Sequence, residues 1–110
     1  MAEDFGSIRV SPEVVAAIIA LSAASVPGVA GLNACGRQPR PLRSVEEFGQ
    51  AVRLNVQGGA VQADVYLTVE RGVNMAQVGL AVQKEAGEAI RNTLGLDVRA
   101  INVYIVDMVR

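Results

Sequence analysis

Few side chains in this sequence are of a type that performs nucleophilic or acid–base chemistry. The 110 residues include one cysteine and no histidine. Cys35 has no imidazole to activate it, so we favour an inert loop thiol, although the neighbouring Arg37 would lower its pKa. The carboxylate pairs at 46–47 and 85–88 fit solvated surfaces, and no nucleophile–base pair can be named. We therefore expect no enzyme, no metal site and no cofactor.

The junction VERGVNM, residues 69–75, is the next place where chemistry could occur, because a strand meets a helix there. Gly72 can adopt the positive φ of a sharp turn, and Asn74 can cap the first turn of the helix. The alternative is an anion site at the helix N-terminus. The junction lacks the lysine and the further glycines of a P-loop. We favour a structural corner.

Residues 33–47 form a segment rich in arginine and proline with no periodicity. Its basic side chains are Arg37, Arg40 and Arg43. They fit either a solvated loop or a contact with anionic lipid headgroups, at ~1 kcal/mol per basic residue near the surface. Three charges are too few to anchor a protein to a membrane alone. We expect this loop to be the most mobile internal segment.

Hydrophobic periodicity predicts two helices. The first begins after a Ser11 cap with Pro12 in its first turn and ends near Val26. Its predicted core stripe is Val14, Val15, Ile18, Leu21 and Ser25. The second spans roughly residues 75–94 and stops at Gly95. Its predicted core stripe is Met75, Val78, Val82, Ala86, Ala89, Ile90 and Thr93.

Strand signals occur in four places. The first is a short strand at residues 7–10, and the next two are a hairpin that turns at Gly58-Gly59. The second hairpin strand should bury Val61, Ala63, Val65, Leu67 and Val69. The last strand, within residues 98–109, changes parity near Ala100, which predicts a bulge or the true start of the strand there.

The element order is therefore β-α-β-β-α-β. It predicts one α+β domain over residues 1–110, a two-layer sandwich with a mostly antiparallel sheet and both helices on one face. The other face carries Tyr66, Thr68, Tyr104, Val106 and Met108 by strand parity. Half-apolar faces of this kind mark contact surfaces, so we expect a homodimer or another protein to bind here.

The charge and hydropathy of the sequence limit which kinds of partner and which location we expect. The net charge is −1 and the pI is about 5.3, so no nucleic-acid partner is expected. The apolar run at residues 14–21 is far shorter than the ~20 residues of a membrane span, which predicts no direct membrane insertion. The N-terminus is acidic and has no signal-peptide core, and the lone cysteine suits the cytoplasm.

Three motifs in order carry a family resemblance: Ile8–Val15, Val26–Gly31 and Gly72–Met75. With the flanking hairpin and last strand, the sequence resembles the alkaline shock protein / Gls family of bacterial envelope-stress proteins over about residues 6–107. The resemblance implies a small cytoplasmic protein without known catalysis, held at the membrane through a partner in some members. Residues 33–47 depart from the family pattern and leave the subgroup open.

The residues favour a non-enzymatic, self-associating scaffold or interaction protein, and the resemblance implies a role in bacterial envelope stress or homeostasis. Its expected partners are itself and another protein, a membrane-bound one included. The alternative is a small RNA- or lipid-surface-binding module, because the predicted strand order matches that of RNA-recognition domains and Tyr66 and Tyr104 share a sheet face.

Overall fold

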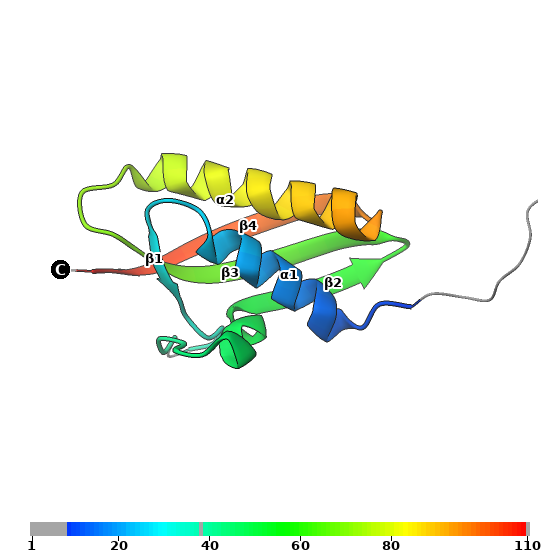
Figure 1. Cartoon of the computed structure of the whole chain (residues 1–110), viewed down its shortest axis with the longest axis horizontal. Coiled ribbons are helices and arrows are strands. Elements are labelled where there is room, and N and C mark those ends of the chain that lie inside the picture. Colours follow the sequence, from blue (N-terminus) through cyan, green and yellow to red (C-terminus); the bar gives the residue numbers. More distant parts are fainter. Residues whose placement is uncertain (1–8, 38, 110) are drawn as a thin grey trace, which may run out of the picture.

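The computed structural model describes residues 9–37 and 39–109 (Figure 1). Two α-helices, two shorter helical turns and four strands follow one another along the chain. They are α1 (Pro12–Ala24), β1 (Val29–Leu32), the 3₁₀ helix η1 (Val45–Ala51), β2 (Val52–Gln57), β3 (Ala60–Val69), α2 (Met75–Ala89), the π-helical turn η2 (Ile90–Leu94) and β4 (Asp97–Met108).

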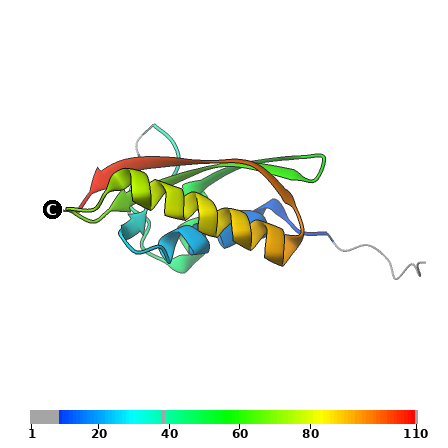
Figure 2. The same ribbon diagram turned by 90° about the horizontal axis from the view of Figure 1, so that it is seen from above.

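The sheet is built around β3. Antiparallel partners β2 and β1 lie end to end along one of its edges, with β2 beside residues 60–65 and β1 beside residues 67–69. Parallel β4 runs along the whole of the other edge. Both helices lie on one face of this sheet, as Figure 2 shows edge-on. The predicted α+β class, the mostly antiparallel sheet and the two-layer arrangement are confirmed.

The predicted element order is wrong at its start. Among the described residues the first strand is β1, which follows α1 and lies where no strand was predicted. Of the strand predicted at residues 7–10, Arg9 and Val10 lie in no strand, and the other two residues lie outside the described part of the chain. Among the described residues the order of α-helices and strands is therefore α-β-β-β-α-β, which does not support the sequence-based argument from RNA-recognition strand order.

The predicted core face of α1 is also wrong. The helix buries Val15, Ala16, Ile19, Ala20 and Ala23. Val14 and Leu21, which were expected in the core, are 47% and 48% exposed. Three of these five buried side chains are alanines. In an almost uniformly apolar helix, hydrophobicity alone does not distinguish one side from the other.

The helix-covered face of β3 agrees with the prediction, since all five of its expected core residues are buried. Helix α2 buries Val78, Val82, Ala86 and Gly87, and Ile90 follows in η2. Met75 and Thr93, at the two ends of its predicted stripe, are exposed. The bulge predicted near Ala100 is present, because the β3–β4 register shifts between Val98 and Ala100.

Candidate interaction surface

We use the term open face for the side of the sheet that faces away from the helices. Its centre is a pair of tyrosines, Tyr66 on β3 and Tyr104 on β4, which are register neighbours. Their rings stack with centroids 4.8 Å apart and planes 25° from parallel. Stacking of this kind packs the two rings against each other and limits their motion. Tyr104 remains 43% exposed, so the pair has a side that faces solvent.

Polar groups surround the tyrosine pair and are bonded to one another. Thr68 donates its hydroxyl hydrogen to Oδ1 of the buried Asn33, at 2.7 Å. Asn102 donates to Oδ1 of Asp64 at 3.0 Å. These bonds hold the side chains in fixed positions. The open face is therefore a pre-formed surface of mixed polarity.

Two of the predicted face residues on β4 lie beside a second bulge. The register shifts after Ile105, so that Asp107 is next to Thr68 and Met108 is next to Val69. Val69 belongs to the helix-covered side, which corrects the assignment of Met108 to the open face. Val106 is the extra residue of the bulge and is 36% exposed. The prediction from strand parity was wrong here, because one added residue reverses the sheet face on which all later side chains lie.

The open face is partly flanked by a loop. The segment after β1 projects from this side of the sheet (Figure 2). Backbone bonds hold its base, from Ala34 N–H to the Arg40 carbonyl and from Cys35 N–H to the Gln50 carbonyl, both at 2.9 Å. The loop lies along the β1–β2 side of the open face and leaves the β4 side of that face accessible. Its mobility stays a prediction.

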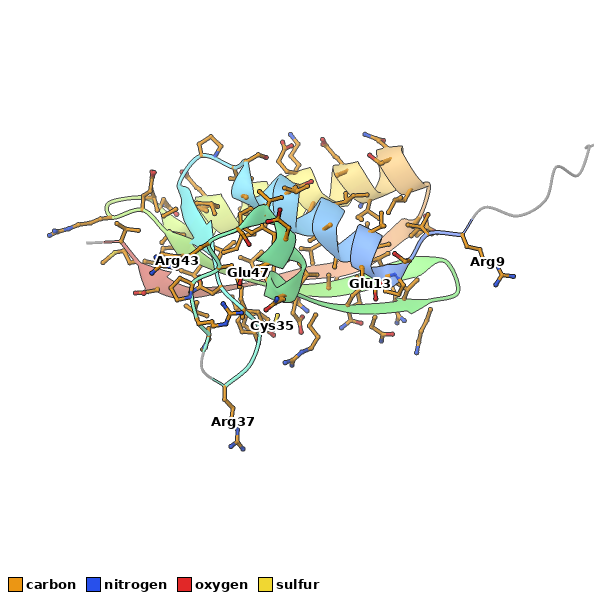
Figure 3. The ribbon with its side chains drawn as sticks, turned by 60° about the horizontal axis from the view of Figure 1, so that its bottom comes forward. Arg9, Glu13, Cys35, Arg37, Arg43 and Glu47 are labelled. Carbon is orange, nitrogen blue, oxygen red and sulfur yellow. The ribbon has the colours of Figure 1, made fainter. Side chains whose placement is uncertain are left out.

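Cys35 lies at the foot of this loop. Partial burial raises the pKa of its thiol, an effect opposed by the charge of Arg53 and reinforced by that of Asp64. The neighbouring charge that lowers the pKa therefore comes from Arg53, not from Arg37 as the sequence suggested. Arg37 instead projects from the loop into solvent (Figure 3). A thiol with a raised pKa is protonated at neutral pH and is a poor nucleophile.

Two of the three loop arginines make contacts within the loop. Nη1 of Arg40 lies 3.7 Å from Oε1 of Glu47, and its Nη2 donates to Oε1 of Gln50. The Arg43 backbone N–H donates to Oε2 of Glu47 at 3.1 Å. This backbone bond is the main reason why the pKa of Glu47 lies below its ordinary value. The acidic partner offsets part of the basic charge that was expected to contact lipid.

The corner at residues 70–75 has the structural roles that the sequence predicted. Gly72 adopts φ +88°, and Oδ1 of Asn74 accepts a hydrogen bond from the Gln77 backbone N–H at 3.0 Å. A shallow hollow of about 470 Å³ lies beside it, between the α1–β1 turn and the start of α2.

Gly28 holds the other side of this hollow and was not singled out from the sequence. It adopts φ +98°, and a Cβ atom there would lie 2.8 Å from Cγ2 of Val78. The Glu70 N–H donates to its carbonyl at 2.9 Å. The signal was present in the Val26–Gly31 motif, whose turn brings the chain against α2.

Two further findings concern membrane and metal chemistry. Among the described residues, no helix is both long and apolar enough to cross a membrane. In the same part of the chain, histidine, cysteine and carboxylate side chains do not gather into groups of three that could hold a metal ion.

Together, the elements define a small α+β domain with a two-layer fold and an open face of mixed polarity. The chain belongs to the alkaline shock protein 23 / Gls24 family, which has a cell envelope-related function; the family matches residues 1–110. This confirms the resemblance found in the sequence.

Individual relatives are similar over most of their length. YloU of Bacillus subtilis (strain 168) is 26% identical over 104 residues, covering 92% of this chain and 87% of YloU. YqhY of the same organism is 29% identical over 106 residues, covering 92% of this chain and 76% of YqhY. Among solved structures, MamM-CTD 215-293 matches with a TM-score of 0.54 and 18% identity, over 88% of this chain and 99% of that one. That likeness is one of fold alone.

Proposed function

We propose that this protein is a non-enzymatic, self-associating interaction protein in bacterial envelope homeostasis, and that it contacts its partners through the open face. The observation that carries the proposal is the stacked pair of Tyr66 and Tyr104, presented on a sheet face that no helix covers. Tyrosine is enriched in protein interfaces, because its ring buries a large area and its hydroxyl tolerates water.

The chemistry of the chain supports a binding role over a catalytic one. The chain has no histidine. Burial raises the pKa of its single thiol. The family's cell envelope-related function supports a position at the inner side of the envelope, with the protein cytoplasmic and held there by a membrane-bound partner.

The RNA-binding and lipid-binding alternatives have less support. Over residues 9–37 and 39–109 the elements do not follow the order that favoured RNA, and the two tyrosine rings stack on each other. For a lipid surface, Arg40 is already paired with Glu47. Neither alternative is supported by an observation of its own.

The test is affinity capture from a bacterial lysate with three matched baits. They are the wild type, the double variant Tyr104→Glu with Val106→Lys, and the control Leu21→Lys. The control changes a similarly exposed apolar residue on α1, in the other layer. Envelope proteins should be retained by the wild type and the control and lost by the double variant. Identical protein sets on all three baits would contradict binding at the open face.

A further inference from the structure

Strand β4 leaves a long edge of the sheet unpaired. It runs for 12 residues beside β3, and among the described residues no strand pairs with its outer edge (Figure 1). Free edges of this length offer rows of N–H and C=O groups to another strand. Proteins normally shorten them, cover them or place charges along them. The part of β4 between its two bulges, residues 100–105, is regular and mostly apolar.

The protein surface beside this edge is apolar as well. A hollow of about 420 Å³ lies between α2 and β4, lined by Met75, Ala76, Gly79, Leu80, Gln83, Val103 and Ile105. Leu80 is 65% exposed, more than any other large apolar side chain among the described residues. Ala76 and Gly79 are small, which would let another helix approach this side of α2 closely. The edge and the helix thus form one apolar border.

One contact shows which backbone groups face outward. Nε2 of Gln83, on α2, donates to the Ile101 carbonyl at 3.0 Å. That carbonyl therefore points away from β3. Since N–H and C=O of one residue in a parallel strand point to the same side, and alternate residues repeat the direction, Val103 and Ile105 also present their groups outward. Three successive outward positions are available for a ladder, and a carbonyl can accept a second bond beside that of Gln83.

The charges along β4 identify a second copy of the chain as the occupant. When β4 is paired antiparallel with itself about Val103, Ile101 falls opposite Ile105 of the second copy. Beyond the regular stretch each strand has one extra residue relative to β3, Arg99 at one end and Val106 at the other. A residue count that includes both brings Arg99 of one copy across from Asp107 of the second, and this pair occurs twice because of the symmetry. Both charged residues are exposed and flank the regular stretch. Opposite charges that face each other across strands stabilise a pairing, and like charges destabilise it.

We infer that two copies of this protein join along β4 in a twofold antiparallel pairing centred on Val103, which merges their sheets into one. This rests on the proposed self-association and names its interface. The twofold axis is perpendicular to the sheet, so both copies keep their helices on the same side. The apolar borders of the two copies then meet at the seam. An isologous contact of this kind closes after two copies.

The pairing also has a consequence for the open face. Because the sheets continue across the seam, Tyr104 of each copy lies near Asn102 of the other. The two tyrosine pairs then become parts of one continuous surface. The dimer would offer a partner two copies of the same site, which raises avidity without new contacts.

The test is a charge-reversal cycle measured by sedimentation of the full chain over a range of concentrations. The variants are Arg99→Glu, Asp107→Arg and the two combined, with Arg71→Glu as a control of equal charge change in the exposed corner. Each single reversal should weaken the dimer about tenfold or more, because two like-charged pairs replace two attractive ones. The combined variant should return to within about threefold of the wild type, and the control should have the wild-type dissociation constant.

A second variant tests the backbone itself. Val103→Pro removes one outward N–H at the centre of the seam and leaves the β3 ladder intact, since proline is tolerated on the solvent side of an edge strand. Circular dichroism checks its fold. A folded Val103→Pro monomer supports the pairing, and a folded variant with wild-type dimerisation overturns it. A dimer that single reversals leave unchanged, or that the combined reversal fails to restore, overturns the β4 seam but not self-association. A monomeric wild type overturns both.

Discussion

The two faces of β3 differ although they come from the same ten residues. On the helix-covered face every side chain is fully buried, from Val61 to Val69. On the open face Tyr66 and Thr68 are only partly buried and are held by a ring stack and a hydrogen bond. Burial of apolar area stabilises the fold, whereas a fixed but accessible surface is what a partner can bind. The comparison teaches that folding and binding can be separated residue by residue along one strand.

The largest difference in the free energy of unfolding is expected between substitutions at two neighbouring residues of β3. Leu67→Ala should lower the free energy of unfolding by about 3 kcal/mol, because it leaves a cavity in the core. Tyr66→Ala should lower it by about 1 kcal/mol, the scale of a lost aromatic stack. Chemical denaturation of both variants measures the difference. Equal losses would mean that the open face is part of the core.

Two glycines with positive φ provide the next test. Gly28→Ala should cost about 2 kcal/mol or more, since the added methyl group meets Val78 in addition to the backbone strain. Gly72→Ala should cost about 1 kcal/mol, because open space surrounds that position. Thermal unfolding of the pair measures both. If Gly72→Ala were the less stable variant, the close approach of Gly28 to Val78 would not be the main reason why Gly28 must be glycine.

The corner should affect stability without affecting binding. Asn74→Ala should cost about 1 kcal/mol through loss of the cap to the Gln77 N–H. Partner capture by this variant should equal that of the wild type at temperatures where the fold survives. Unchanged stability combined with lost capture would make the corner a binding site.

The smallest effect is expected in the loop of residues 33–47. Its amides should exchange fastest of any internal segment. The pKa of Glu47 is depressed in the folded state, so its contribution is present above the ordinary value of 4.5 and is lost as pH falls below that value. The Arg43 amide, which donates to this carboxylate, should lose protection relative to its neighbours in that range. Strong protection of the whole loop at neutral pH would contradict its predicted mobility.

Much of the fold could be predicted because local signals agreed with the tertiary structure. The caps at Ser11 and Asn74 are present as predicted. The alternation in β3 identified its buried face correctly, since one side of that strand is wholly covered. The stacked tyrosines could likewise be assigned to a shared face from parity alone, because no bulge separates them in the register.

Other features depended on information that local sequence does not carry. Strand β1 is VAGL, four residues without alternation, and only its pairing with the end of β3 makes it a strand. Met108 was misassigned because the bulge at Val106 is a property of strand pairing. The contact of Asn33 with Thr68 joins residues 35 positions apart. The apolar border at Leu80 left a signal, since this leucine lies outside the predicted core stripe of α2.

The central claim is that self-association uses β4, through its unpaired edge and the open face next to it. Analytical ultracentrifugation of the wild type next to the double variant Tyr104→Glu with Val106→Lys tests it most directly. The wild type should form a dimer as concentration rises. The double variant should remain monomeric, because in the pairing about Val103 its two charges lie within the seam, opposite Asn102 and Ala100 of the second copy. A wild type that stays monomeric at high micromolar concentration, or a dimer that the double change leaves intact, would contradict the claim.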